Sequence, residues 1–230
     1  MPATGLRVAL VPPLVLACGA AFAQVGWNIA FLSDDRYRGV SLSDGQPAVR
    51  LSVGFDAPSG WFGGASLTSV SLGQDERQLQ MLGYGGFVGR LTDRLGWEAG
   101  VIAVHYTADT RYDYGEAFAG LTGERWNLRV HYAPDYFGSG ARTVYTEFNV
   151  GLPLSQMTRA TAHAGALVQV GGVPAAGERT TLDGSLGLAV GRDAWEVRLE
   201  WVAGGRAPIH PIGYRRAASS ALVLSASLAF

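Results

Sequence analysis

The stretch WEVRLEWV, residues 195–202, poses the question that decides the fold. Trp195, Val197, Leu199 and Trp201 alternate with three charged side chains, so a β-strand here would carry one apolar and one charged face. In a soluble sheet the apolar face would be covered by a core. In a membrane barrel the apolar face would contact lipid, and the charged face would line the lumen.

The composition favours a β protein with little charged outer surface. Hydrophobic residues make up 48% of the 230 residues and charged ones only 16%, below the roughly 25% of an ordinary soluble domain. The formal net charge is −1, so the charge does not favour nucleic acid as a partner. All 18 basic residues are arginine. Two explanations stay open: phosphate or lipopolysaccharide binding by guanidinium groups, and codon bias of the source genome.

The first 23 residues match a secretory signal peptide. Arg7 supplies the positive charge, residues 8–17 form the apolar stretch, and residues 21–23 (AFA) fit the small-residue cleavage pattern. Cleavage after Ala23 leaves a mature domain of residues 24–230, which lacks cysteine because the only one is Cys18. Cleavage before Cys18, as in lipoproteins, remains an alternative, although the preceding residues are a poor lipobox.

The mature chain reads as short alternating segments separated by turn residues, without helical periodicity. The longest uncharged run, residues 160–177, contains histidine, glutamine, proline and four glycines, so it does not fit a membrane-spanning helix of about 20 apolar residues. We expect twelve strands, near residues 25–32, 46–55, 61–70, 78–89, 96–106, 113–120, 126–132, 143–151, 159–170, 181–190, 195–203 and 218–230.

Two further patterns favour a barrel over a soluble sandwich. The expected connections alternate between long and short, as in outer-membrane barrels with short periplasmic turns and longer external loops. The chain ends in ALVLSASLAF, where Leu222, Leu224, Leu228 and the terminal Phe230 share one face. We expect this aromatic end to be read by the barrel-assembly machinery. The sequence therefore predicts an all-β, transmembrane, antiparallel up-and-down β-barrel of about 12 strands.

Residues 33–64, SDDRYRGVSLSDGQPAVRLSVGFDAPSGWFGG, resemble the opening motif of the TorF-type porin family of proteobacterial outer-membrane proteins. YGEAFAGL (residues 114–121), VHYAPDYFG (residues 130–138) and the aromatic-ended last strand are also similar to this family, whereas residues 204–216 do not match it. The resemblance implies an outer-membrane barrel with a porin role and no catalytic residues.

The polar faces of the expected strands give a candidate lumen with both signs of charge. Its members are Arg50, Glu98, Arg129, Glu147, Asp183, Glu196, Arg198 and Glu200. Two interpretations compete: a water-filled pore crossed by a transverse field, and a lumen closed by Arg–carboxylate pairs. Twelve strands leave room for either.

No pattern in the chain predicts catalysis, a cofactor or a metal site. The four histidines are scattered, and no serine lies in a nucleophile motif. The glycine-rich GYGGFVG, residues 83–89, lacks the following helix that phosphate binding needs. Tyr84, Trp97, Trp126, Tyr132, Trp195 and Trp201 are candidates for aromatic girdles at the membrane interfaces, or for ordinary packing.

We therefore expect a porin or narrow channel for small hydrophilic solutes or ions in the outer membrane of a Gram-negative bacterium. Its expected partners are outer-membrane lipid, lipopolysaccharide, the barrel-assembly machinery and the solutes. An alternative is a closed barrel that binds a ligand or partner through residues 133–142 and 204–217, which carry Tyr136, Phe137, Arg206, Arg215 and Arg216. A lipid-modifying outer-membrane enzyme is the third hypothesis.

Overall fold

The computed structural model describes residues 24–72, 77–173, 179–204 and 218–230. The expected signal peptide, residues 1–23, lies outside the described residues. Strands dominate the described chain, with two short 3₁₀ turns, η1 (Thr110–Tyr112) and η2 (Tyr136–Gly138). The described residues contain no helix that is long and apolar enough to cross a membrane.

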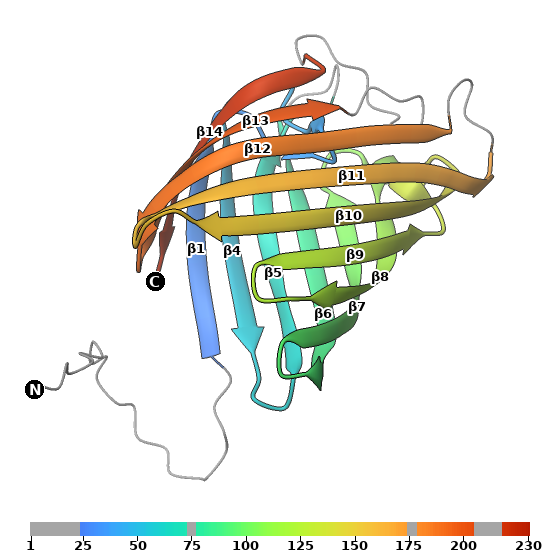
Figure 1. Ribbon diagram of the computed structural model, residues 1–230. Coiled ribbons are helices and arrows are strands. Elements are labelled where there is room, and N and C mark those ends of the chain that lie inside the picture. Colours follow the sequence, from blue (N-terminus) through green and yellow to red (C-terminus); the bar gives the residue numbers. More distant parts are fainter. Residues whose placement is uncertain (1–23, 73–76, 174–178, 205–217) are drawn as a thin grey trace, which may run out of the picture.

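Twelve antiparallel strands close into one barrel, which confirms the predicted fold (Figure 1). Each strand pairs with its neighbours in the chain, and the last strand pairs with the first. The strands are β1 (Gln24–Leu32), β4 (Ala48–Asp56), β5 (Trp61–Val70), β6 (Gln78–Thr92), β7 (Leu95–Tyr106), β8 (Tyr114–Thr122), β9 (Trp126–Ala133), β10 (Ala141–Pro153), β11 (Thr158–Gly172), β12 (Thr180–Arg192), β13 (Trp195–Gly204) and β14 (Ser220–Ala229).

The seam between β1 and β14 closes the barrel. Five residue pairs, from Asn28↔Ala229 to Leu32↔Ser225, hold the two strands in register. The main chains of Trp27 and Phe230 extend the seam, because each donates its N–H to the carbonyl of the other at 3.0 Å. Closure leaves no unpaired strand edge, as a barrel in lipid requires.

The two ends of the barrel differ in the length of their connections. Residues 57–60, 93–94, 123–125, 154–157 and 193–194 form the short turns at one end. The strand ends at the opposite end of the barrel are separated in the sequence by residues 33–47, 71–77, 107–113, 134–140, 173–179 and 205–219, of which 73–76, 174–178 and 205–217 lie outside the described residues. The predicted alternation therefore holds, and the carboxyl terminus lies at the short-turn end (Figure 1).

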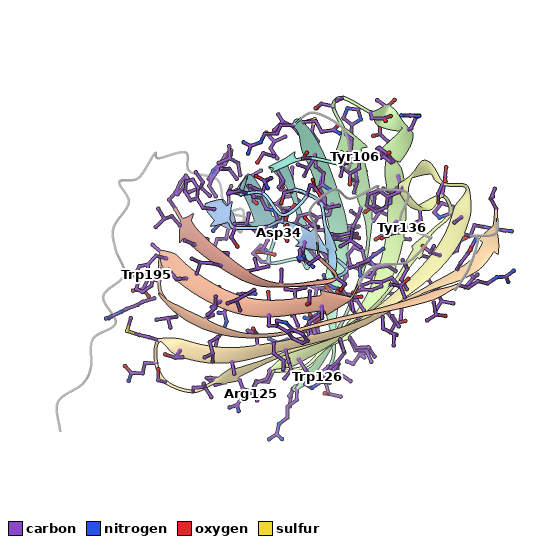
Figure 2. The ribbon with its side chains drawn as sticks, turned by 90° about the horizontal axis from the view of Figure 1, so that it is seen from above. Asp34, Tyr106, Arg125, Trp126, Tyr136 and Trp195 are labelled. Atoms are coloured by element: carbon purple, nitrogen blue, oxygen red, sulfur yellow. The ribbon has the colours of Figure 1, made fainter. Side chains whose placement is uncertain are left out.

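The outer wall is apolar, which answers the question raised by residues 195–202. Trp195, Leu199 and Trp201 are 42%, 46% and 50% exposed, while Glu196 and Glu200 line an internal cavity. Figure 2 shows Trp126 and Trp195 on the outside of the ring of strands and Asp34 within it. A continuous apolar outer surface is typical of a barrel wall that faces lipid.

Aromatic side chains gather on the outer wall near the short turns. Trp61 packs edge-on against Phe87 with ring centroids 5.3 Å apart, and Phe87 contacts Trp97 at 5.8 Å. Such a belt is typical of a membrane interface. Tyr84, which the sequence made a girdle candidate, instead lines an interior cavity, because the glycines around it hide the alternation of the two faces.

Candidate functional site in the lumen

A central cavity of about 620 Å³ lies inside the barrel. It is lined from β1, β4 and β9–β13 and by residues of the loop 33–47, among others. Seven of the eight charged residues expected in the lumen line it: Arg50, Arg129, Glu147, Asp183, Glu196, Arg198 and Glu200. The eighth, Glu98, is buried and accepts two hydrogen bonds from Arg129, at 2.6 and 2.9 Å.

Every arginine that lines the cavity is in an ion pair. The pairs are Arg36–Asp34, Arg38–Glu116, Arg50–Asp35, Arg129–Glu98 and Arg198–Glu196. Because guanidinium groups stay charged, these pairs neutralise the basic side of the lumen without filling it. Paired charges thus line a lumen that still contains a cavity.

Three carboxylates of the same cavity, Glu147, Asp183 and Glu200, form no ion pair with an arginine of the described chain. Glu147 lies 3.4 Å from His131, Asp183 lies 2.8 Å from His163, and Glu200 accepts from Ser185 at 2.7 Å. They project from the adjacent strands β10 to β13, so the negative charge not matched by guanidinium lies on one wall.

Two histidines, on β9 and β11, lie beside these carboxylates, and no local sequence pattern places the two together. His163 contacts Asn149 through Nδ1 at 2.7 Å and Asp183 through Nε2 at 2.8 Å. His131 lies between Glu147 and Glu116, 3.4 and 3.3 Å away. Their partners come from other strands, so local sequence spacing could not reveal them. His210 lies outside the described residues.

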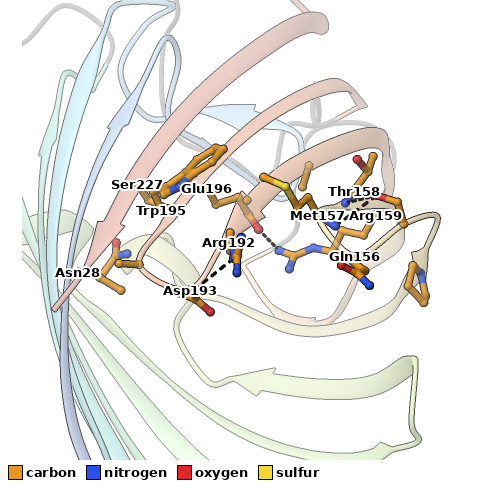
Figure 3. Close-up of a pocket in the computed structure, with 16 residues that line it drawn as sticks. Asn28, Gln156, Met157, Thr158, Arg159, Arg192, Asp193, Trp195, Glu196 and Ser227 are labelled. Carbon is orange, nitrogen blue, oxygen red and sulfur yellow. Dashed lines mark hydrogen bonds and ion pairs between the residues drawn. The ribbon is translucent and has the colours of Figure 1, made fainter. Parts of the chain in front are cut away.

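A second hollow of about 650 Å³ lies at the short-turn ends of β10 to β14 (Figure 3). Glu196 is held there between Arg159, at 2.5 Å, and Arg198, at 3.0 Å. Asn28, Glu196 and Ser227 line both this hollow and the central cavity. The two spaces therefore adjoin at these residues.

The loop 33–47 folds into the barrel at the opposite end. It carries a hairpin of β2 (Arg36–Tyr37) and β3 (Val40–Ser41), and Arg38 at its tip donates two hydrogen bonds of 2.7 Å to Glu116 on β8. Asp35 is 1% exposed. Burial raises the pKa of its carboxyl, and the nearby Arg50 acts in the opposite direction.

An aromatic cluster fills the lumen beside this loop. Tyr114 stacks on Phe137 with centroids 4.7 Å apart, and Tyr106 lies 6.0 Å from the same ring. Tyr136 and Phe137 are 0% and 1% exposed. They were expected on a partner-binding external loop, and that expectation was wrong, because η2 turns both rings into the barrel. Arg206, Arg215 and Arg216 of the same hypothesis lie outside the described residues.

Comparison with known proteins identifies the family. A family model described as "Bacterial protein of unknown function (Gcw_chp)" matches residues 17–220. The chain belongs to the Gcw_chp family. No curated protein matches this Gcw_chp chain in sequence.

Solved structures share the fold of the Gcw_chp barrel. A NanC porin superposes with a TM-score of 0.60 at 12% identity, over 90% of this chain and 99% of the porin. A KdgM porin gives 0.57 at 8% identity, over 90% and 98%. A second KdgM structure, in complex with disordered oligogalacturonate, gives 0.54 at 7% identity over the same shares. At these identities the likeness concerns the fold alone.

Proposed function

We propose that this Gcw_chp protein is a narrow outer-membrane channel for small hydrophilic solutes or ions. The observation that carries the proposal is a closed barrel with an apolar outer wall and a charged, partly hollow lumen. The porin fold of NanC and KdgM supports it. We further propose export with cleavage after Ala23 and assembly through the barrel-assembly machinery into a membrane of lipid and lipopolysaccharide. The TorF-type assignment also remains a proposal, which rests on residues 33–64.

The charge of the lumen favours cations and neutral solutes over polyanions. Six carboxylates and five guanidiniums line the central cavity, and every one of these guanidiniums already faces a carboxylate. One KdgM porin structure is in complex with disordered oligogalacturonate, which is an acidic sugar chain. An acidic chain would find no arginine without a carboxylate partner on the lining of the central cavity, so we propose a different solute class.

Planar-bilayer recording of refolded residues 24–230 tests the proposal. A band that shifts on heating would first establish that the barrel is folded. We expect small, reproducible conductance steps with a reversal potential that favours potassium over chloride. A folded barrel that gives no steps in repeated insertions would overturn the channel proposal.

A further inference from the structure

The tip of the inward hairpin has an unfavourable backbone conformation. Arg38 and Gly39 have φ values of +52° and +75°, the left-handed region that both central residues of a type I′ turn require. Glycine adopts it freely, but an arginine there is uncommon. A residue held in such a conformation persists because its surroundings fix it, and such residues cluster at functional sites.

The tip spans the barrel. The loop leaves β1, and Glu116, which binds Arg38, is on β8, five strands away in one direction round the barrel and seven in the other. A Cβ added to Gly39 would lie 2.9 Å from the Cβ of Asp183. The hairpin tip therefore extends from β1 across the lumen, to β8 on one side and β12 on another.

The Arg38 guanidinium is enclosed on several sides. Its side chain is 3% exposed and that of Glu116 is 1% exposed. The rings of Tyr145, Tyr37 and Tyr136 lie 4.1, 4.6 and 5.3 Å from the guanidinium carbon. These distances suit cation–π contacts. A buried pair gives little net stability compared with apolar residues of the same size, so its geometric role is the more informative one.

Hydrogen bonds within the loop 33–47 hold the residues on both sides of the tip in one conformation. Asp34 accepts hydrogen bonds from Arg36 at 2.7 Å, Ser41 at 2.5 Å and Ser43 at 3.0 Å. Ser43 accepts from the backbone of Asp35 at 2.9 Å. These residues belong to the stretch that carries the family resemblance, and the channel proposal assigns them no role.

We propose that the Arg38–Glu116 pair is a bar across the lumen that sets the upper size of solute the barrel admits. This inference rests on the proposed channel function and specifies which residues limit the size of the solutes that the channel admits. Solutes must pass beside the bar. The size limit for solutes therefore depends on the space that the hairpin leaves free, and not on the full diameter of the twelve-stranded barrel. The specificity-determining residues are then Arg38 and Glu116.

The test removes the bar without leaving a buried charge unpaired. In the double variant Arg38→Gly/Glu116→Gln both charges disappear, and glycine suits the positive φ of position 38. A charge exchange, Arg38→Glu/Glu116→Arg, keeps a pair in the same place. Arg111→Ala is the matched control, because Arg111 pairs with Asp109 on an exposed connection at the same end. Each protein is measured by conductance and by the swelling of proteoliposomes in neutral mono-, di- and trisaccharides.

We expect the double glycine–glutamine variant to raise conductance by about two-fold or more, since a wider polar constriction conducts better, and to admit a larger sugar. The exchange variant and the Arg111 control should match the wild type. A silent, folded wild type would overturn the channel proposal, and the bar would fail with it even if the double variant conducts. A conducting wild type with an unchanged, folded double variant would overturn the bar and leave the channel proposal standing. If both folded barrels are silent, the channel proposal fails, and the bar fails with it.

Discussion

At the scale of single residues, Arg198 is the side chain through which the charge of the lumen can be changed most directly. It lines the central cavity, is one-third exposed, and pairs with Glu196 at 3.0 Å. Arg198→Glu should move the reversal potential further towards cation preference, because it replaces a positive charge by a negative one beside Glu196. Measurement in a potassium chloride gradient checks this. Arg111→Glu, outside the lumen, should leave the potential unchanged, and equal shifts in both variants would contradict a lumen position for Arg198.

For Phe230 we propose a role in assembly of the barrel and none in the passage of solutes. The residue is 76% exposed on the outer wall, while its main chain forms two hydrogen bonds with Trp27. Phe230→Ala keeps the main-chain bonds and removes the ring. We expect a loss of folded barrel in cell membranes, because a recognition signal is gone, with unchanged refolding of the purified chain in detergent. The folded fraction in cell membranes and in detergent is measured on gels, from the band that shifts on heating. An equal loss in detergent would show that the ring acts on stability and not on recognition.

At the scale of elements, a glycine pair lets β6 and β7 accommodate aromatic rings in the lumen. Gly86 and Gly100 face each other across the two strands, and Cβ atoms added to them would lie 2.7 Å from the rings of Phe62 and Phe118. The added Cβ at Gly100 would also lie 2.5 Å from the carbonyl oxygen of Gly85. The rings of Phe62 and Phe118 can therefore lie against these strands only because side chains are missing at the two glycines.

Gly100→Ala should lower the free energy of unfolding by about 1–3 kcal/mol, the usual cost of overpacking. Urea unfolding of the barrel in lipid vesicles measures it. Gly83→Ala on the adjacent strand is the control, because an added Cβ there meets nothing within 4 Å. Equal unfolding curves for the two variants would contradict the prediction, because they would show that the barrel accommodates a Cβ at Gly100.

The elements also show how far the sequence could be interpreted. Strand number and most strand faces were predictable, because each follows from a period of two within a few residues, as in residues 126–132. The inward hairpin was not predictable in this way. Arg38 and Glu116 are separated by 78 residues, and no local pattern connects them. Tyr136 and Phe137 were misplaced for the same reason, since their ring partners come from β7 and β8.

At the scale of the whole molecule, the different lengths of the connections at the two ends and the aromatic belt predict how the barrel is oriented in the membrane. The short turns should face the periplasm and the long connections the exterior. Residues 24–230 contain no cysteine, so single introduced cysteines can report on which side of the membrane a connection lies. Ala108→Cys should react with a membrane-impermeant maleimide in intact cells. Ser59→Cys should react only after the outer membrane is disrupted, and the reverse labelling would overturn the orientation.

The seam has a consequence for how the chain is arranged around the barrel. The first and last strands of the barrel are neighbours, and two main-chain hydrogen bonds connect Trp27 to Phe230 at the short-turn end. A short linker could therefore connect the two ends, and new ends could be opened at the exposed turn of residues 93–94, since such surface turns tolerate cuts. A circular permutant made in this way would keep every strand pairing, while the hairpin that crosses the lumen would no longer lie in the first connection of the chain.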